Sequence, residues 1–333
     1  MRIQCEASDA PDALWVYCPS FAAAILFSIL FGSTTLAHTV QAVIYRKRFA
    51  FVLIMGGMWE CGGYITRTLS VIDQKNTAIY TVQQLLILLA PLWINAYIYM
   101  LLGRMIHFFL VDDRVFGLRA RKITKCFVWF DVIAFLVQAT GGMMATPDAS
   151  AKTQKLGLDI YTAGVGLQLF FLSIFTSLAV GFQRRLKQQS QSPVANDSGS
   201  DYDPESYLQP RSGPHTPSPA LARRLLILLY IVMVLVIIRN IYRLVEFATG
   251  VDSPIVKHEW FSYVWDAAPM FIAMIVLNIE YPGKVLQGPR ADFRQEDRDI
   301  KMAKKEKKAE KKRQKQERKH GHHAKYTGLE DQA

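Results

Sequence analysis

This sequence of 333 residues lacks the short motifs that mark most nucleotide-driven pumps and hydrolases. It has no G-x-x-x-x-G-K-[ST] segment, which excludes a P-loop for ATP or GTP within this chain. It has neither an H-E-x-x-H pair nor a G-x-S-x-G turn, which excludes the common zinc and serine hydrolase sites. We therefore expect no catalytic residues, no cofactor and no bound metal.

Cysteine is also scarce, with four residues in all, and none of them forms a C-x-x-C pair or a metal-binding spacing. Cys5 lies before the first apolar run and Cys18 lies at its start, and a disulfide between them would need an oxidising compartment. The alternative is that all four are unpaired small apolar residues, and the sequence leaves both open.

The last apolar run, 260–281, contains no lysine, which argues against a retinal Schiff base.

Charged residues are nearly absent from a series of long apolar runs, although the chain as a whole is 51% hydrophobic and 20% charged. These runs are about 20 residues long, which as a helix crosses a hydrocarbon core of about 30 Å. Backbone groups in lipid must be hydrogen-bonded within their own segment, so such runs form helices. The sequence predicts an all-α membrane protein, a bundle of seven spanning helices at 16–45, 49–70, 79–106, 122–145, 157–182, 222–247 and 260–281.

Lysine and arginine are unevenly distributed between the two ends of these helices. The gaps at 45–49, 104–125 and 184–224 and the C-terminal tail contain 31 of the 39 basic residues. Basic residues gather on the cytosolic side of membrane proteins, so we expect an N-terminus outside and a cytosolic C-terminus. The N-terminus has three acids and a single arginine before the first run, unlike the basic start of a cleavable signal peptide.

Three regions follow, an extracellular N-terminus at 1–15, a membrane domain at 16–283 and a charged tail at 284–333. Within the membrane domain, 188–219 is rich in Ser, Pro and Gly and is expected to be a disordered cytosolic loop. The basic tail either lies against anionic inner-leaflet lipid or is simply solvated. It lacks the interleaved aromatic residues that would favour nucleic acid, and nothing in the sequence sets an oligomeric state.

Polar residues inside the predicted helices are costly to bury in lipid and are therefore candidates for function. In the second and sixth helices, three such residues are spaced i, i+4, i+7 and so share one face. They are Glu60, Tyr64 and Arg67, and Arg239, Arg243 and Glu246. With Asp131 and Gln138 of the fourth helix and Asp266 of the seventh, they form the candidates for a substrate-binding site or polar cavity.

Six of the charged candidates are expected to form one cluster in the outer half of the membrane: Glu60, Arg67, Arg239, Arg243, Glu246 and Asp266. Arg243 can pair with Glu246 three residues further on, whereas Arg239 needs a partner from another helix, either Asp266 or Glu60. Two interpretations remain open. The ion pairs lock the helices together, or they line a cavity that accommodates a polar head group.

Small residues in these helices allow close contact between neighbouring backbones. The glycines expected at such contacts are Gly56, Gly57, Gly62, Gly63, Gly141 and Gly142. Pro91 and Pro269 lie within predicted spans and should kink them. The glycine pattern favours a tightly packed bundle.

Two segments resemble motifs of the fungal RTA-like family, also called the lipid-translocating exporter family. They are Glu60-Cys-Gly-Gly63-Tyr64-Ile-Thr-Arg67 and Arg239-Asn-Ile-Tyr242-Arg243-Leu-Val-Glu246. Further similar segments are Tyr17-Cys18-Pro19-Ser20, His38 with Gln41, Tyr80-Thr-Val-Gln83, Ala90-Pro91, Asp131 with Gln138 and Gly141, Gly164–Gln168 and Tyr281-Pro282-Gly283. Where the family's closing segment has His-Pro, this chain has Tyr281-Pro282, which gives no support to a proton role for that histidine.

The resemblance implies a seven-helix protein of the plasma membrane or an endomembrane that exports or flips sphingoid bases or other toxic amphiphiles. The resulting hypothesis is a translocator of lipids or amphiphilic small molecules that does not hydrolyse ATP. A cationic head group would be attracted to Glu60, Glu246 and Asp266, while Arg239 and Arg243 hold those acids. The alternatives are a seven-helix receptor or sensor, and a regulator of membrane stress responses.

Overall fold

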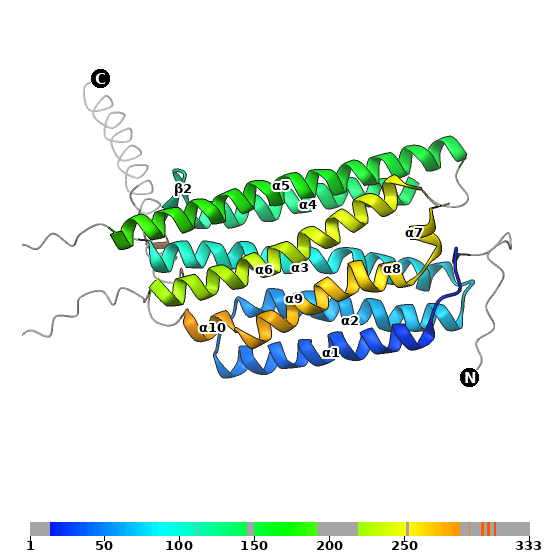
Figure 1. The fold of residues 1–333 in the computed structure, drawn as a ribbon, viewed down its shortest axis with the longest axis horizontal. Coiled ribbons are helices and arrows are strands. Elements are labelled where there is room, and N and C mark those ends of the chain that lie inside the picture. Colours follow the sequence, from blue (N-terminus) through cyan, green and yellow to red (C-terminus); the bar gives the residue numbers. More distant parts are fainter. Residues whose placement is uncertain are drawn as a thin grey trace, which may run out of the picture. The chain divides into compact units, whose positions relative to one another are not determined.

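The computed structural model describes residues 14–110, 112–144, 150–191, 219–250 and 253–286, together with 293, 301–302, 305–306 and 310. The chain divides into two units, Met1–Leu286 and Gln287–Ala333. The described residues of the first unit form a bundle of long helices (Figure 1). Cys5, residues 192–218 of the predicted loop and most of the tail lie outside the described residues.

Helices occur at each of the predicted positions in the described part of the chain. They are α1 (Phe21–Ile44), α2 (Ala50–Ile72), α3 (Thr77–Phe109), α4 (Ala120–Met144), α5 (Ala151–Gln191), α6 (Pro219–Ala248) and a last stretch made of α8 (Trp260–Ser262), η2 (Tyr263–Ala267) and α9 (Ala268–Ile279). The connections include a two-stranded antiparallel hairpin, β1 (Arg114–Val115) and β2 (Leu118–Arg119), and the short helices α7 (Pro254–Lys257) and α10 (Pro282–Val285).

Helices α1 and α5 differ most from the predicted boundaries, and α5 begins at Ala151 rather than at 157. Helix α1 begins at Phe21 rather than at 16, because the Ser20 side chain caps it by accepting a hydrogen bond of 3.3 Å from the Ala23 N–H. Helix α5 continues to Gln191, so the prediction of a disordered segment is wrong for residues 188–191.

Six helices in the described part of the chain are long and apolar enough to cross a membrane. Helix α2 is not among them, although it is 23 residues long. Its four glycines, Glu60 and Arg67 lower its mean hydropathy. The polar residues that make α2 a candidate for function thus also weaken its signal as a membrane span.

The helices pack in chain order, each beside the next (Figure 1). The α9 helix lies between α6 and α1, so the order closes on itself, and α3 also contacts α6. Consecutive long helices run in opposite directions. The start of α1, the ends of α2 and α6 and the start of α8 therefore lie at one end of the bundle, which we call the N-terminal end.

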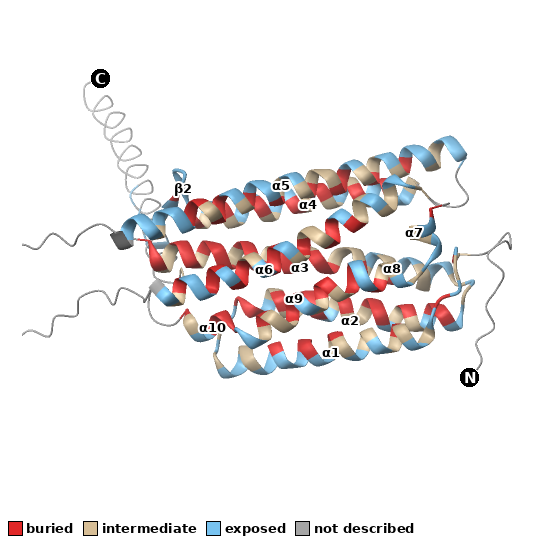
Figure 2. Ribbon diagram, viewed as in Figure 1, coloured by how far each residue is buried: buried red, intermediate tan, exposed pale blue. Residues whose placement is uncertain are grey.

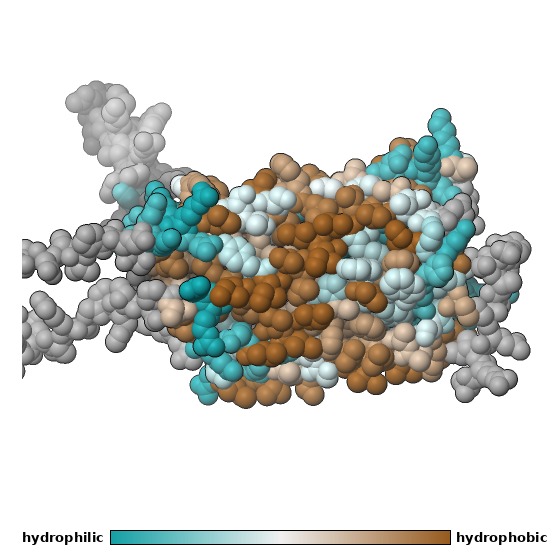
Figure 3. Space-filling model, viewed as in Figure 1, coloured by the Kyte–Doolittle hydropathy of each residue, from teal (hydrophilic) through white to brown (hydrophobic). Residues whose placement is uncertain are grey.

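The outer surface of the bundle differs from that of a water-soluble protein. Large apolar residues are exposed on the outer faces of the helices; on α1 they include Leu26, Ile29, Leu36 and Val43. Several charged and amide residues are buried, and Figure 2 shows buried residues along each of the long helices. Figure 3 shows an apolar band across the middle of the visible face, with hydrophilic residues towards its ends. The chain is an integral, multi-pass membrane protein.

Glycines mark the closest helix contacts, as the sequence predicts. A Cβ at Gly141 of α4 would lie 2.4 Å from the Tyr161 backbone nitrogen of α5, and a Cβ at Gly57 of α2 would lie 2.2 Å from Thr35 Oγ1 of α1. Gly56 and Gly63 meet α3 in a similar way, whereas Gly62 and Gly142 have ordinary contacts. The larger side chains of other residues could not replace the glycines at the tight positions without moving a helix.

Cys18 forms a disulfide bond, so the interpretation of all four cysteines as unpaired is wrong for Cys18. Its predicted partner, Cys5, lies outside the described residues. Cys61 and Cys126 are free thiols.

Candidate functional site

Asp266 lies in η2, a π-helical turn between α8 and α9. A π-turn changes the direction of side chains within a helix and is frequent at functional sites. Asp266 is 3% exposed and is held by two arginines of α6. Arg239 Nε lies 2.8 Å from Asp266 Oδ1, and Arg243 Nη2 contacts Oδ2. Of the two predicted partners for Arg239, Asp266 is therefore the one that pairs with it.

Arg243 also connects Asp266 to a second acid. Its Nη1 lies 3.0 Å from Glu246 Oε2, which confirms the predicted pair at i, i+3. The Tyr242 hydroxyl donates a hydrogen bond of 2.9 Å to the other oxygen of Glu246. Two arginines are thus matched by two acids from α6 and η2.

Glu60 of α2 is the fifth charged residue of this group, and it is only 2% exposed. It lies within electrostatic range of Asp266, Arg239 and Arg243. Among the described residues, however, no ion pair or hydrogen bond reaches its carboxyl group. We call Glu60, Arg239, Arg243, Glu246 and Asp266 the Asp266 cluster; within it, Glu60 is the acid in excess.

Arg67 does not belong to this group, which corrects the prediction of a single cluster. Its guanidinium lies 2.8 Å from Glu259 Oε1 and donates hydrogen bonds to the hydroxyls of Tyr263, at 3.1 Å, and Tyr17, at 2.9 Å. The Trp15 ring lies 4.9 Å from the same guanidinium, within the range of a cation–π contact. These five residues form what we call the Arg67 cluster, at the N-terminal end of the bundle.

Glu259 makes the Arg67 cluster a junction between three parts of the chain. Its second carboxylate oxygen accepts a hydrogen bond of 2.6 Å from the Ser20 N–H, at the start of α1. Burial raises the pKa of Tyr17, so its hydroxyl keeps its proton at neutral pH. The cluster therefore ties the segment before α1 to α2 and to the start of α8.

Sequence analysis missed Glu259, Tyr17 and Tyr263 as site residues. Glu259 lies just outside the last predicted span and Tyr17 at the very start of the first, and at the ends of spans polar residues are ordinary and carry no signal. Tyr17 did belong to a segment that resembles the RTA-like family, which was the available hint. The pairing needed the fold, because Arg67 and Glu259 are 192 positions apart.

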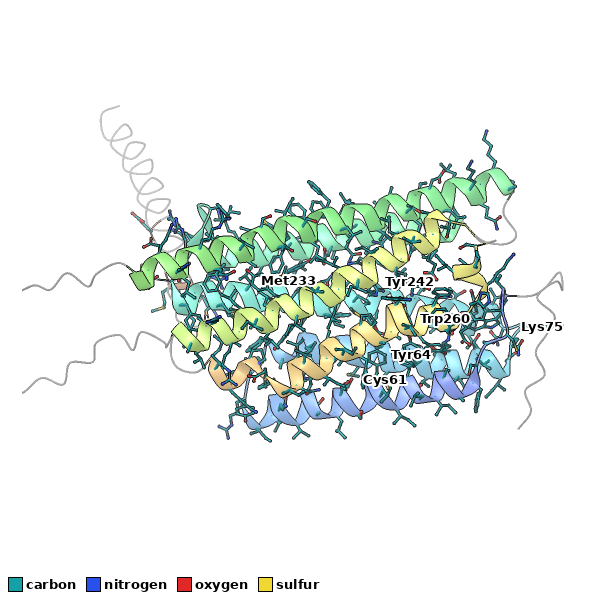
Figure 4. The ribbon with its side chains drawn as sticks, in the orientation of Figure 1. Cys61, Tyr64, Lys75, Met233, Tyr242 and Trp260 are labelled. Atoms are coloured by element: carbon teal, nitrogen blue, oxygen red, sulfur yellow. The ribbon has the colours of Figure 1, made fainter. Side chains whose placement is uncertain are left out.

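Tyr64 lies between the two clusters, one turn after Glu60 and one turn before Arg67. Its ring stacks on Phe31 with centroids 5.5 Å apart and lies 6.0 Å from Tyr263. Phe27 packs against both tyrosines. Figure 4 shows Tyr64 and Tyr242 in the half of the bundle that leads to Lys75, at the N-terminal end. The rings of Phe27, Phe31 and Tyr64 thus form an aromatic layer that separates the Asp266 cluster from the Arg67 cluster.

Asp131 and Gln138 of α4 take part in different contacts from those of the two clusters. The Tyr99 hydroxyl of α3 donates a hydrogen bond of 2.9 Å to Asp131 Oδ2. The Gln138 side-chain amide donates one of 3.0 Å to Gln168 of α5. Apart from Tyr64, the predicted candidates therefore fall into four separate groups, two of which contain ion pairs.

Known proteins resemble this chain over most of its length. The family model described as "RTA1 like protein" matches residues 53–289. The protein named "Probable lipid transporter atnI" of Emericella nidulans is 39% identical over 289 residues, covering 86% of this chain and 72% of that relative.

Two relatives from Saccharomyces cerevisiae have other names. "Protoporphyrin uptake protein 1" is 29% identical over 309 residues, covering 82% of this chain and 93% of the relative. "Sphingoid long-chain base transporter RSB1" is 25% identical over 305 residues, covering 86% and 78%. No solved structure matches this chain. The family model spans more than half of the sequence, and the chain belongs to the RTA1-like family.

Proposed function

We propose that this protein moves lipids or similar amphiphiles across the membrane without hydrolysing ATP. The observation that carries the proposal is the Asp266 cluster, a group of buried charges inside a bundle whose outer surface is apolar. Such an interior suits a substrate with a polar head group and a hydrocarbon tail. The names of relatives, a lipid transporter and a sphingoid long-chain base transporter, support the same class of substrate.

The proposal includes seven spans, with the N-terminus outside and the C-terminus in the cytosol. Helix α2 lies between α1 and α3 and is 23 residues long, enough to cross beside them. The disulfide at Cys18 suits the oxidising side of the membrane. The plasma membrane is the compartment that we propose.

Glycosylation tests this orientation. Asn196-Asp197-Ser198 is an acceptor sequence that the proposed orientation places in the cytosol, so it should stay unmodified in a eukaryotic cell. Ala151→Asn creates an acceptor at the opposite end of α5, where modification is expected. A mobility shift on a gel that glycosidase treatment removes would report each site, and the reverse pattern would invert the orientation.

The charge balance of the Asp266 cluster supports a main role for Glu60 in substrate binding. Arg239 and Arg243 are already matched by Asp266 and Glu246. A cationic amine, such as the head group of a sphingoid base, would supply the missing positive charge at Glu60. A buried charge is tolerated when it has a partner of opposite sign, so the head group would be bound most tightly inside the bundle.

The same arginines provide a second arrangement for the empty site. Both lie within electrostatic range of Glu60 as well as of Asp266. Without substrate, one of them can turn toward Glu60, and an arriving head group would return it to Asp266. Opening toward the N-terminal end would also require the Arg67–Glu259 pair and the aromatic layer at Tyr64 to separate.

The experiment follows a fluorescent sphingoid base between the leaflets of liposomes that contain the purified protein. The wild type should accelerate this movement relative to empty liposomes. Glu60→Gln should slow it about tenfold or more, because a charge-assisted contact contributes roughly 1.5–3 kcal/mol. The matched control is Glu280→Gln, the same change in an exposed pair with Arg224, which should leave the rate unchanged.

The outcomes separate two questions. If folded wild-type protein moves no lipid, translocation is wrong, and the receptor or regulator alternatives take its place. If Glu60→Gln matches the wild type, translocation stands but the role of Glu60 does not. The elution volume and melting temperature of each variant show whether it is folded.

A further inference from the structure

A second buried acid lies outside the Asp266 cluster. Asp131 of α4 is 2% exposed, and no lysine, arginine or histidine among the described residues contacts it. Its Oδ2 accepts the hydrogen bond from Tyr99, while its Oδ1 has no hydrogen-bond partner in the described part of the chain. A carboxylate buried in this way lacks both a counter-charge and full hydrogen bonding, which is costly in a membrane interior.

A second polar side chain beside Asp131 is also unsatisfied. Asn95 lies on α3, one turn before Tyr99, and is fully buried. The Asn95 amide interacts with the Asp131 carboxyl group, but the two do not have the geometry of a hydrogen bond. Neither Nδ2 nor Oδ1 of Asn95 has a hydrogen-bond partner among the described residues. Buried polar groups are rarely left unpaired, so two such oxygens at one place favour the binding of a small ligand there.

The surroundings favour a ligand that carries a single positive charge. Phe127 of α4 and Phe175 of α5 pack against the Tyr99 ring, with centroids 5.5 and 4.5 Å away. Tyr99 is the titratable group that faces Asp131, and α5 contributes aromatic surface there. These aromatic rings carry no charge, so the charge of the aspartate is left to be neutralised by what binds.

We propose that Asp131, Asn95 and Tyr99 form a site for a small monovalent cation, a proton or a sodium ion, whose binding is coupled to lipid movement. This inference rests on the proposed function. A proton would bind at Asp131 Oδ1, turning the carboxylate into a neutral acid. A sodium ion would be coordinated by the same oxygen together with Asn95 Oδ1, both of which suit a hard cation.

Helix α3 connects this site to the Asp266 cluster. It packs against α2, which carries Glu60, against α4, which carries Asp131, and against α6, which carries the two arginines. Pro91 lies one turn before Asn95 and removes a backbone hydrogen bond, so α3 can bend at this point. Cation binding at Asn95 and Asp131 would favour one bend of α3 and so bias the position of α2 and α6.

The test uses liposomes that contain wild-type protein, Asp131→Asn or Asp159→Asn. Asp159 is an exposed residue of α5, so its variant is the matched control. One arm sets a pH gradient at equal sodium, and the other sets a sodium gradient, balanced with choline, at equal pH. At least one gradient should change the rate of sphingoid-base movement at least twofold in the wild type and in Asp159→Asn, and the response should be lost in Asp131→Asn.

The two arms distinguish the proton from sodium, because each gradient changes one cation alone. The response of empty liposomes, which contains the substrate's own titration, is subtracted from every rate. A wild type that responds to neither gradient, or an Asp131→Asn variant that still responds, would overturn the coupling. If the wild type moves no lipid at all, the proposed function fails, and infrared difference spectra then test the site alone. A carboxyl band that changes with pH or sodium in the wild type and is absent from Asp131→Asn supports the site; an unchanged spectrum overturns it.

Discussion

Asp266 and Asp131 are buried to nearly the same extent, at 3% and 2% exposure, yet the bundle stabilises them in different ways. Asp266 lies between two arginines, and Asp131 faces a tyrosine hydroxyl and an amide. In the first arrangement the carboxylate has positively charged partners in fixed positions, whereas in the second it has no counter-charge in a fixed position. Burial alone therefore does not tell whether an intramembrane acid holds helices together or waits for a ligand.

The largest effect is expected where an ion-pair partner is removed from the Asp266 cluster. Asp266→Ala leaves Arg239 and Arg243 buried with a single acid, Glu246, in direct contact. Breaking a buried pair in this way costs about 3–5 kcal/mol. Thermal unfolding in detergent should show a large loss of stability. A variant as stable as the wild type would contradict the view that these charges hold α6 against η2.

The contact between α4 and α5 is expected to depend on close packing instead. Gly141→Leu would force a side chain into the α5 backbone at Tyr161 and should cost about 1–3 kcal/mol or more. The control is Gly166→Leu, the same change at a glycine of α5 with open space around it, which should cost little. Equal melting temperatures for the two variants would argue against the contact between α4 and α5.

A smaller effect is expected in the Arg67 cluster, where geometry matters as well as charge. Lysine keeps the positive charge but cannot reach Glu259, Tyr263 and Tyr17 at once, because it lacks the planar guanidinium. Arg67→Lys should therefore cost about 1 kcal/mol, the contribution of a typical hydrogen bond. If Arg67→Lys and Glu259→Gln had strictly additive effects in a double-mutant cycle, the two side chains would not interact.

The smallest effect on stability is expected at Asp131. Asn has the same shape and can still accept the hydrogen bond from Tyr99, and no arginine is left unpaired. Asp131→Asn should therefore change the unfolding free energy by less than about 1 kcal/mol. Comparison with Asp266→Asn in the same assay gives the most direct contrast between the two aspartates. A large loss at Asp131 would mean that its charge is structural.

Much of the fold was predictable because backbone groups in lipid must be hydrogen-bonded within their own segment, which makes long apolar runs helical. Each long apolar run became a helix, and the glycines expected at tight contacts, such as Gly57 and Gly141, lie there. Local chemistry moved the boundaries: the Ser20 cap delays the start of α1, and α5 extends beyond the apolar run into its polar flanks. Such flanks carry no hydropathy signal, so the pattern alone could not place those ends.

The candidate site was predictable only in part. The pairing of Arg243 with Glu246 follows from helix periodicity within one segment. The choice of Asp266 for Arg239 depended on how η2 lies against α6, and the separation of Arg67 from the other charges depended on Glu259, in a connection between helices. Helix periodicity places residues on a face but does not say which face of another helix it meets.

The sequence by itself determined that this chain is a helical membrane protein, because lengths and hydropathy are properties of each segment alone. It also determined which side chains are too polar to face lipid. Only the tertiary structure decided which of them meet, leaving Glu60 and Asp131 without an ion-pair partner among the described residues while Asp266 has two. The physical reason is that an ion pair depends on separations of a few ångströms between helices, and these are set by the packing of the whole bundle.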